Sequence, residues 1–245
     1  SDVCSSDLGY PMAGHLQAHG HQVTVYNRTQ AKAAGWVNAH KGAQAATPAA
    51  AATGADFVMA CVGNDDDLRS VCLGETGAFS AMDPSAVFVD HTTVSAQVTK
   101  ELAGLWGAKG GKFIDAPISG GQAGAENGVL SVMCGGDVAA YGAAEPGMAA
   151  YARICRLIGP SGAGQMTKMC NQIAIAGLVQ GLSEALHFAD KAGLDGAAVV
   201  EVISQGAGGS WQMSTLKQTK LQYKFKHGYD VDLIRNALGM CQGGG

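Results

Sequence analysis

The sequence lacks the features that mark several classes of protein. It has no basic tract, and 20 acidic residues outnumber 16 basic ones to give a formal net charge of −4, which argues against nucleic acid as a partner. No apolar run approaches the ~18 residues of a membrane-spanning helix, and the first residues do not show the basic-then-apolar pattern of a signal peptide. We therefore expect a cytoplasmic protein that binds neither nucleic acid nor a membrane.

The sequence also gives few signs of disulfides or metal sites. Its seven cysteines are spread singly, and their odd number fits reduced cytosolic thiols. The acidic run NDDDL (64–68) resembles a magnesium-binding cluster, but an asparagine followed by acids is also a typical helix start. We predict a capped helix there and no metal site.

What is present is an alternation of short apolar runs with helical segments. Such near-continuous runs predict strands buried on both faces, as in a mostly parallel sheet covered by helices. We expect six of them, in HQVTVYNRT, ADFVMACVGN, SAVFVDHTT, GKFIDAPISGG, GVLSVMCGG and ARICRLIGP. Sheets of this kind bind ligands beyond the carboxyl ends of their strands. The polar loops after these runs, including His91 in DHTT, are therefore candidate site segments.

The character of the sequence changes near Gly159. After the break GPSGAG, the segment 165–193 predicts one helix of roughly 28 residues, ~42 Å long. It is apolar nearly all round, which is typical of a buried helix, and one copy offers too little surface to cover it. We therefore expect a dinucleotide-binding domain over 1–160, an all-helical domain over 161–245, and a homodimer.

The motif VYNRT (25–29) ends the first predicted strand without a carboxylate. In a dinucleotide-binding sheet, an acid at this place binds the ribose of NAD, whereas an arginine accommodates the 2′-phosphate of NADP. Arg28 could bind a phosphate through its guanidinium, with Asn27 and Thr29 donating hydrogen bonds. The alternative is a plain strand-to-helix turn in which Asn27 or Thr29 caps the helix.

Two further motifs carry candidate substrate-binding chemistry. In DAPISGG, Ser119, Gly120 and Gly121 offer a hydroxyl and bare backbone N–H groups that can cradle a carboxylate, although SGG also occurs in plain glycine loops. In GAGQMTKMCNQ, Lys168 and Asn171 share one face of the predicted long helix. Lys168 could donate a proton to a developing alkoxide, or could simply extend from a helix end into solvent.

Taken together and in order, these stretches resemble the β-hydroxyacid dehydrogenase family, which includes 3-hydroxyisobutyrate dehydrogenase, tartronate semialdehyde reductase and, more distantly, 6-phosphogluconate dehydrogenase. The resemblance runs from Gly9 to about Met240 through GYPMAGHL, VTVYNRT, CVGN, DHTT, DAPISGGQAGAENG, GAGQMTKMCNQ and SWQM. It implies a Rossmann-type doubly wound sheet followed by an all-α domain. It also implies hydride transfer between NADP(H) and a small β-hydroxyacid or its semialdehyde.

The resemblance implies a role for each matching residue. Lys168 is the general acid/base, Asn171 orients the substrate, and the substrate pocket includes Ser119, Gly120, Gly121 and Trp211. NADPH is the preferred cofactor. The implied cofactor-binding residues are Gly9, Asn27, Arg28, Thr29, Val62, Gly63, Asn64 and Thr93. A related imine reductase usually replaces the lysine, so Lys168 argues against imine reduction.

The sequence departs from the family at both ends. The family opens with a strand and GxGxxG, of which Gly9 matches only the last glycine, while Cys4 and Ser6 stand at the other two. Asn236 and Ala237 replace a lysine and an aspartate near the cofactor, and the last helices of the second domain are absent.

From these departures we expect a fragment truncated at both ends. Residues 1–8 read as a translated sequencing adapter, and the first, central strand of the sheet has no candidate. A sheet without that strand has unpaired edges, so we expect this chain to fold poorly and to bind its cofactor weakly. The alternative to the enzyme is a non-catalytic family member that acts only in binding or assembly.

Overall fold

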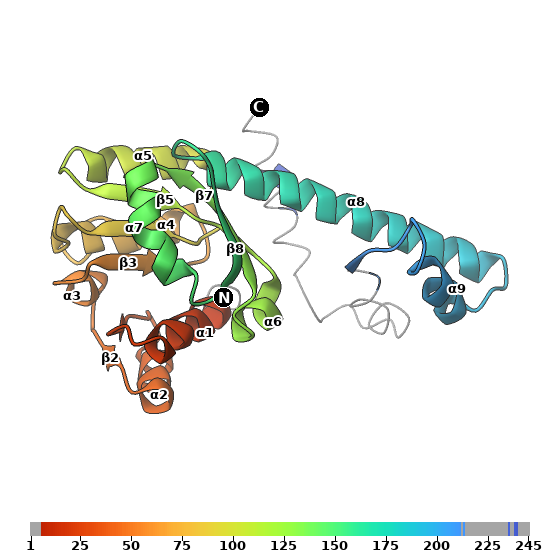
Figure 1. Cartoon of the computed structure of the whole chain (residues 1–245), viewed down its shortest axis with the longest axis horizontal. Coiled ribbons are helices and arrows are strands. Elements are labelled where there is room, and N and C mark those ends of the chain that lie inside the picture. Colours follow the sequence, from red (N-terminus) through yellow and green to blue (C-terminus); the bar gives the residue numbers. More distant parts are fainter. Residues whose placement is uncertain (1–5, 212, 214–234, 236–237, 240–245) are drawn as a thin grey trace. The chain divides into compact units, whose positions relative to one another are not determined.

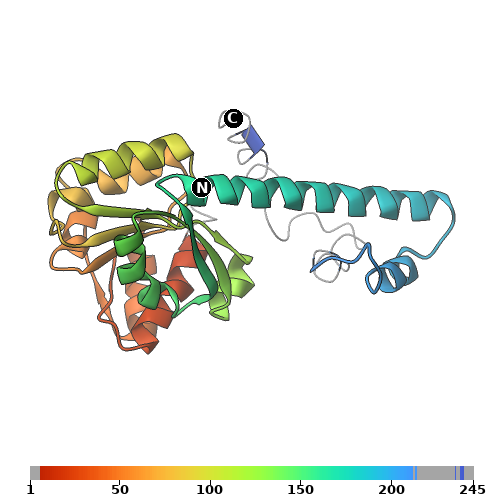
Figure 2. The same cartoon turned by 45° about the horizontal axis from the view of Figure 1, so that its top comes forward.

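The chain divides into two compact units that meet inside one long helix. A computed structural model describes residues 6–211, 213, 235, 238 and 239. The units meet between Lys168 and Met169, within helix α8 (Ala163–Lys191). Figure 1 labels the elements, and Figure 2 shows α8 as one unbroken helix. The functional division into residues 1–160 and 161–245 stays a prediction.

The first unit is built on a twisted sheet, which has six strands in the described part of the chain. Its strands follow the order β3-β4-β5-β7-β6, and β8 also pairs with β7. Their bounds are β3 (Phe57–Ala60), β4 (Val87–Asp90), β5 (Lys112–Asp115), β6 (Ile118–Ser119), β7 (Leu130–Gly136) and β8 (Ala152–Gly159). The pairs β3–β4, β4–β5 and β7–β8 are parallel, whereas β7 runs antiparallel to β5 and β6.

A second, two-stranded parallel sheet stands apart from the first. It pairs β1 (Thr24–Val25) with β2 (Ala43–Gln44). No strand among the described residues links β1 to β3. A doubly wound sheet is normally continuous across this position. The place of the predicted missing strand is therefore a gap between two strand edges.

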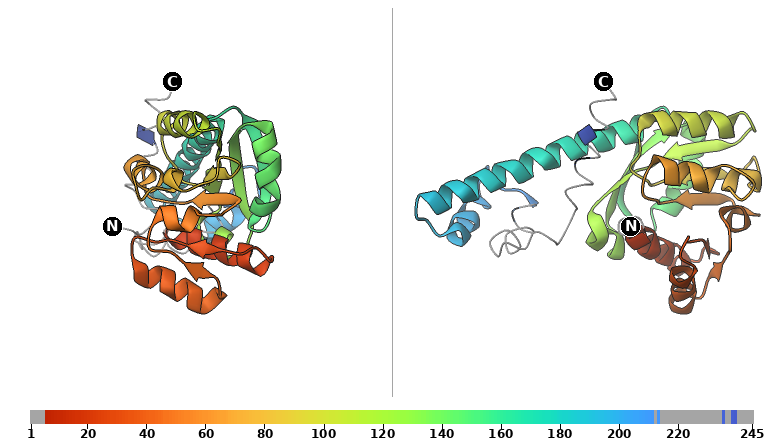
Figure 3. Two further views of the ribbon diagram at one scale, coloured as in Figure 1. Left: turned by 90° about the vertical axis from the view of Figure 1, so that its left-hand side faces the viewer. Right: turned by 180° about the vertical axis from the view of Figure 1, so that it is seen from behind.

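Helices cover both faces of the six-stranded sheet. Val87 and Val89 of β4 pack into one buried cluster with Met148, while Phe88 between them packs into another with Leu68 and further aromatic residues. In the left-hand view of Figure 3, α7 (green) and α4 (orange) lie on opposite sides of the strands. The helices and the one 3-10 turn of this unit are α1 (Ser6–Ala18), α2 (Gln30–His40), α3 (Pro48–Ala52), α4 (Asp65–Cys72), η1 (Ala78–Ser80), α5 (Ala96–Gly107), α6 (Gly121–Glu126) and α7 (Val138–Met148). The predicted fold class is confirmed.

The second unit consists of helices as far as the structure describes it. The rest of α8 is followed by α9 (Gly196–Ile203), and Leu182, Val200 and Met213 form its small buried cluster. Four apolar side chains of α8 are between 44% and 71% exposed in a single copy: Met166, Ile173, Leu178 and Phe188. The homodimer expected to cover this helix stays a prediction.

Among the described helices, none combines the length and apolar character needed to cross a membrane. Most of the predicted all-helical domain after Trp211 lies outside the described residues.

Candidate active site

The loops after β3, β4 and β5 meet at one edge of the first unit's sheet. The three strands are parallel and in register, so that Ala60 lies beside Asp90 and Asp90 beside Asp115. Their carboxyl ends therefore share one edge, where open α/β sheets bind ligands. The start of α8 packs against the same edge.

Asp115 fixes the start of α8 to the end of β5. Its Oδ1 accepts the backbone N–H of Gly162 at 2.8 Å, and its Oδ2 accepts that of Gln165 at 3.1 Å. Burial raises the pKa of Asp115, and these N–H groups act against that rise. A Cβ on Gly164 would lie 2.4 Å from the carbonyl oxygen of Met133. The helix can approach the sheet this closely only because residue 164 is glycine.

Gln165 ties the same helix turn to the loop after β4. Its buried side chain accepts the N–H of Val94 at 3.2 Å and donates to the carbonyl oxygen of Thr92 at 2.7 Å. Thr92 in turn accepts the N–H of Val62 through its hydroxyl at 3.1 Å. Three loops of the site are thus joined by hydrogen bonds, and the two that Gln165 makes are buried. The predicted cofactor-binding residue Thr93 sits half-buried between Thr92 and Val94.

Lys168 lies one turn beyond Gln165 and is only 6% exposed. Its Nζ donates a hydrogen bond to the carbonyl oxygen of Ile118 at 2.8 Å. The interpretation of Lys168 as a side chain extending into solvent is therefore wrong. The ammonium group is instead held directly before the loop that begins with Ser119.

The glycines after Ser119 adopt backbone conformations that other residues rarely take. Gly120 has φ +135° and Gly121 has φ +62°. A Cβ on Gly120 would also lie 3.1 Å from Cδ2 of Leu130, whereas one on Gly121 would meet nothing within 4 Å. The loop therefore depends on glycine for its shape.

Asn171 and Trp211 belong to the second unit. Asn171 follows Lys168 by three positions on the continuous helix α8, and its Nδ2 donates to Oε1 of Gln172 at 2.9 Å. Trp211 is 65% exposed. Asn236 and Ala237 lie outside the described residues.

The predicted cofactor loop Val62–Asn64 leads directly into α4. Asn64 caps this helix by accepting the N–H of Asp67 at 2.9 Å, so the capped helix predicted at NDDDL is confirmed. A Cβ on Gly63 would come within 2.7 Å of Oδ2 of Asp67. Among the described residues, no group of three or more His, Cys, Asp or Glu side chains is placed to hold a metal ion.

Asn27–Thr29 forms a turn at the end of β1. Oδ1 of Asn27 accepts the N–H of Thr29 at 2.8 Å, while the Thr29 side chain makes no capping bond to α2. Arg28 is 65% exposed on its side chain, and its guanidinium lies 3.4 Å from Oδ1 of Asp67. This exposed ion pair, which joins the turn to the start of α4, was not predicted from the sequence.

Gly9 lies in α1 beside Cys61. A Cβ on Gly9 would be 3.7 Å from the Cβ of Cys61, an ordinary contact distance. Packing alone therefore does not require glycine at this position.

His91 is a buried structural residue. It is fully buried, its Nδ1 lies 2.7 Å from the carbonyl oxygen of Ala116, and its Nε2 lies 2.8 Å from the hydroxyl of Tyr151. Burial lowers the pKa of His91 to about 4, which keeps the ring neutral. Its neighbour Asp90 is also fully buried, and burial raises the pKa of Asp90 to about 7. The suggestion that His91 lines an accessible site is not supported.

Two family models together match most of the chain. Residues 6–159 match the family model described as the NAD binding domain of 6-phosphogluconate dehydrogenase. Residues 162–244 match the model described as NAD-binding of NADP-dependent 3-hydroxyisobutyrate dehydrogenase.

Individual relatives match over most of their length. An uncharacterized oxidoreductase of Shewanella frigidimarina is 55% identical over 96% of this chain and 80% of its own. The 3-hydroxyisobutyrate dehydrogenase of Pseudomonas aeruginosa is 31% identical over 96% and 81%. The structure of Mycobacterium tuberculosis 3-hydroxyisobutyrate dehydrogenase with L-serine superposes with a TM-score of 0.85 at 28% identity, covering 97% of this chain and 82% of that one.

The fold and the two family models together place the chain in a class of proteins, the oxidoreductases that use a nicotinamide cofactor. More narrowly, the chain belongs to the β-hydroxyacid dehydrogenase family, and the resemblance seen in the sequence is confirmed. The family assignment supports NAD(P)-dependent hydroxyacid dehydrogenase activity.

Proposed function

We propose that the protein transfers a hydride between NADP(H) and a small β-hydroxyacid or its semialdehyde, with Lys168 as general acid and base. The observation that carries this proposal is the burial of Lys168 with its Nζ 2.8 Å from the carbonyl oxygen of Ile118. A buried ammonium group held by a backbone carbonyl at the edge of a nucleotide-binding sheet suits proton transfer better than structural support. Asp115 and Gln165 hold the helix turn that presents it.

In the proposed reduction, Lys168 donates a proton from Nζ to the substrate carbonyl oxygen as negative charge develops there. In the reverse direction, the neutral amine accepts the proton of the alcohol. When bound, the nicotinamide cofactor supplies or accepts the hydride. Ser119 and the backbone N–H groups of Gly120 and Gly121 bind the substrate carboxylate, while Asn171 orients the substrate and Trp211 shapes its pocket.

The residues at the carboxyl edge suit a dinucleotide. The cavity between β1 and β3 has Gly9, Asn27 and Val62 on its lining, and the Arg28 side chain is exposed beside it. We propose that Gly9 lies at the pyrophosphate and that Asn27, Arg28 and Thr29 hold the adenosine ribose and its 2′-phosphate.

The remaining cofactor contacts are proposed on the neighbouring loops. Val62, Gly63 and Asn64 cover the cofactor, and Thr93 contacts its nicotinamide end. The turn at Arg28 carries no carboxylate to hold the 2′-hydroxyl of NAD, which favours NADPH over NADH. The proposal includes a cytoplasmic location and a homodimer.

The test replaces Lys168 by alanine and compares it with Lys109→Ala. Lys109 also donates to a backbone carbonyl, that of Phe79 at 3.0 Å, but lies away from the proposed site. Turnover of β-hydroxyacids and their semialdehydes should fall roughly 10²–10⁴-fold in Lys168→Ala and stay within twofold in Lys109→Ala. NADPH affinity should be unchanged in both.

Chemical rescue separates lost chemistry from lost structure. Added methylamine should restore part of the turnover of Lys168→Ala, because it supplies the missing amine in the space left by the side chain. Full turnover by Lys168→Ala would disprove the assignment of Lys168. A protein that binds NADPH but turns over no hydroxyacid before mutation would support the non-catalytic alternative.

A further inference from the structure

Two cysteines on neighbouring strands of the sheet point their sulfur atoms at each other. Cys134 lies in β7 and Cys155 in β8, and their Sγ atoms are 3.5 Å apart. Sδ of Met148, at the end of α7, lies 3.9 Å from Sγ of Cys155. Cys134 is fully buried, whereas Cys155 is partly exposed. Neither thiol takes part in the proposed hydride transfer.

The two thiols differ in how readily they ionise. The thiol of Cys134 donates to Cys155, which lowers the pKa of Cys155 against the opposing effect of burial, and the hydroxyl of Tyr141 acts in the same direction. The contact with Cys155 and burial both raise the pKa of Cys134. Because the thiolate is the reactive form of cysteine, Cys155 is the thiol that reacts first, and Cys134 stays protonated beside it.

The register of the two strands makes the cysteines diagonal neighbours on one face of the sheet. Cys134 stands opposite Leu157, and Cys155 stands opposite Val132. With ~4.8 Å between strands and ~3.3 Å per residue along a strand, this offset of two residues separates the Cα atoms by ~8 Å. A disulfide normally joins Cα atoms ~4.4–6.8 Å apart. To close the bond, β8 must therefore shift along β7.

The ends of this paired segment can absorb such a shift. The register of β7 and β8 already changes between Leu130 and Ser131, and again between Cys134 and Gly135. Among the described strands, β8 pairs only with β7, so no described strand on its other edge resists the movement. A disulfide that closes by displacing a strand is strained, and strained disulfides are the ones most easily reduced.

We propose that Cys134 and Cys155 form a reversible disulfide in the presence of hydrogen peroxide. The Cys155 thiolate attacks one peroxide oxygen, the O–O bond breaks, and hydroxide leaves, which gives a sulfenic acid on Cys155. The hydroxide takes up the proton that Cys155 lost on ionising. The sulfur of Cys134 then attacks the sulfur of the sulfenic acid, and the thiol proton leaves with the hydroxyl group as water. Both cysteines are oxidised, the peroxide is reduced to two molecules of water, and exchange with an external dithiol restores the two thiols.

The disulfide would act on the start of α8. Cys134 stands between Met133 and Gly135, whose backbones both lie close to the first turn of this helix. A Cβ on Gly164 would be 2.4 Å from the carbonyl oxygen of Met133, and a Cβ on Gly135 would be 2.7 Å from Oδ1 of Asp115. A shift of β8 against β7 should therefore weaken the two backbone hydrogen bonds that the Asp115 carboxylate accepts. Any effect on turnover rests on the proposed function, whereas the disulfide itself does not.

Peptide mapping of the whole chain tests the disulfide. Trypsin places Cys134 in the peptide 113–153 and Cys155 in the peptide 154–156. Treatment with an equimolar amount of hydrogen peroxide, followed by blocking of free thiols in denaturant, should link these two peptides. Dithiothreitol should separate them again. Cys170→Ser removes an exposed cysteine of α8 and should leave the linked pair unchanged.

Two alanine variants separate the roles of the two thiols. In Cys134→Ala, the sulfenic acid of Cys155 cannot be resolved, so dimedone should label the peptide 154–156 after peroxide treatment. In Cys155→Ala, Cys134 should stay unmodified. Burial also raises the pKa of Cys72, so Cys72 should stay reduced in every sample and serves as the internal control.

Hydrogen exchange tests the link to α8. The amides of Gly162 and Gln165, which donate to Asp115, should exchange at least fivefold faster in the oxidised protein than in the reduced protein. Dithiothreitol should restore the slow exchange. Peroxide should leave both amides unchanged in Cys155→Ala.

Three results would overturn the proposal. Peptides that stay unlinked with both thiols reduced, even in excess peroxide, would show that the pair is not oxidised. Dimedone labelling of Cys155 in the unmutated protein, without the linked pair, would show that Cys134 does not resolve the sulfenic acid. A linked pair with unchanged exchange at Gly162 and Gln165 would disprove the action on α8. None of these measurements uses turnover, so failure of the proposed function would leave their outcomes unaffected.

Discussion

The carboxylate of Asp115 accepts the backbone N–H of Gln165 at 3.1 Å, although the two residues are far apart in the sequence. This bond sets the first turn of α8 against the end of β5. The helix then presents Lys168 to the carbonyl oxygen of Ile118. The position of the proposed acid/base is therefore governed by Asp115 through the backbone of α8.

Asp115→Asn should lower turnover through this linkage. The amide can replace only one carboxylate oxygen as an acceptor, so one buried N–H, of Gly162 or Gln165, loses its partner. Stability should fall by about 1–3 kcal/mol, and turnover should fall at unchanged NADPH affinity. The control is Asp137→Ala, which removes the acceptor for Ala140 N–H at the start of α7. It should cost about 1 kcal/mol without a turnover defect. An equal turnover loss in both variants would mean that general destabilisation is the cause.

Gln165→Glu should damage the site more than its small change in shape suggests. The new carboxylate cannot donate to the carbonyl oxygen of Thr92, which lies 2.7 Å from the amide nitrogen it replaces. It also places a charge in a fully buried position. We expect at least a tenfold loss of turnover, measured beside Gln180→Glu, an exposed position on the same helix. The role of Gln165 would be refuted by a variant with normal turnover and normal stability.

Arg28→Ala should reveal the cofactor preference. Loss of a charge-assisted bond to phosphate weakens binding by about 10–100-fold, so NADPH affinity should fall by this amount while NADH affinity changes less than twofold. Asp67→Asn should strengthen NADPH binding slightly, because Asp67 competes for the guanidinium at 3.4 Å. Arg69→Ala is the control, since Arg69 pairs with Glu101 instead. Equal losses for both cofactors in Arg28→Ala would contradict the preference.

Gly120→Ala and Gly121→Ala should separate the cost of backbone strain from the cost of a side-chain clash. Both positions lie in the loop that we propose to bind the substrate carboxylate. Both glycines have positive φ, but only the Cβ on Gly120 would also press on Leu130. Gly121→Ala should lower the free energy of unfolding by about 1 kcal/mol, and Gly120→Ala should lower it by up to about 3 kcal/mol. If the loop binds the substrate carboxylate, both should raise KM for the hydroxyacid more than KM for NADPH.

Asp90 and His91 should oppose each other in the pH dependence of stability. Asp90 has a raised pKa of about 7, so the folded state holds a proton that the unfolded state releases above its ordinary pKa near 4. The contribution of Asp90 to the free energy of unfolding is therefore lost as the pH rises toward 7. His91 has a lowered pKa of about 4, so the unfolded state takes up the extra proton below about 6.5, and its contribution grows as the pH rises.

Between pH 4 and 6.5 these two contributions should nearly cancel. Asp90→Asn should then show stability that rises with pH, with a slope of up to about 1.4 kcal/mol per pH unit. His91→Asn should show the opposite slope. Denaturant unfolding at several pH values measures both. Parallel pH profiles for the two variants would contradict the assigned protonation states.

The sequence was most informative where a strand is a continuous apolar run. The strands β4 and β5 and the long helix α8 were predicted, because burial on both faces and helical spacing leave clear patterns in the sequence. The short strands β2 and β6 were not predicted, because neither coincides with a continuous apolar run of its own. The antiparallel direction of β7 was also not predicted, since an apolar run does not encode direction.

The candidate site was inferred from motifs, whereas the contacts that hold its residues were not predicted. Lys168 and the SGG loop stood out as residues with chemistry. The buried Nζ of Lys168 donates to the carbonyl oxygen of Ile118, and the carboxylate of Asp115 accepts the N–H of Gly162 just before α8. Such bonds between distant segments leave no local signal, and neither does the pairing of Arg28 with Asp67.

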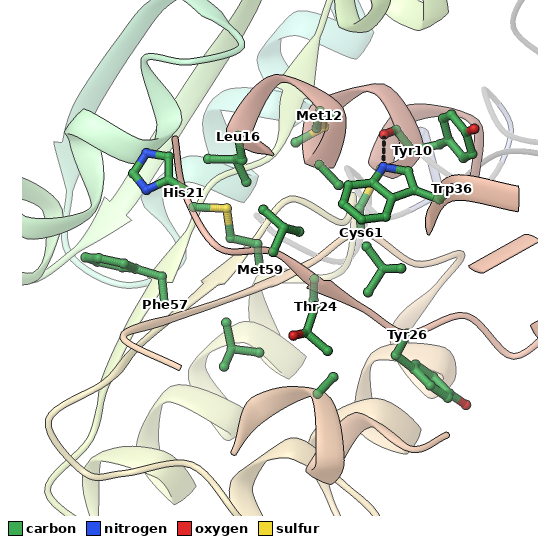
Figure 4. A pocket seen from close by; sticks show the side chains of 18 of the residues that line it. Tyr10, Met12, Leu16, His21, Thr24, Tyr26, Trp36, Phe57, Met59 and Cys61 are labelled. Atoms are coloured by element: carbon green, nitrogen blue, oxygen red, sulfur yellow. Dashed lines mark hydrogen bonds between the residues drawn. The ribbon is translucent and has the colours of Figure 1, made fainter. Parts of the chain in front are cut away.

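The gap between β1 and β3 has a consequence for how the molecule opens. Among the described residues no strand carries hydrogen bonds across this gap. The helix α2 and the small sheet are therefore held partly by the bond from the Trp36 indole to the carbonyl of Tyr10 at 3.1 Å, drawn in Figure 4. We expect residues 20–47 to form a separate cooperative unit with a lower opening free energy than the six-stranded sheet. Limited trypsin digestion should therefore cut first at Lys32 or Lys41, before any cut near β4.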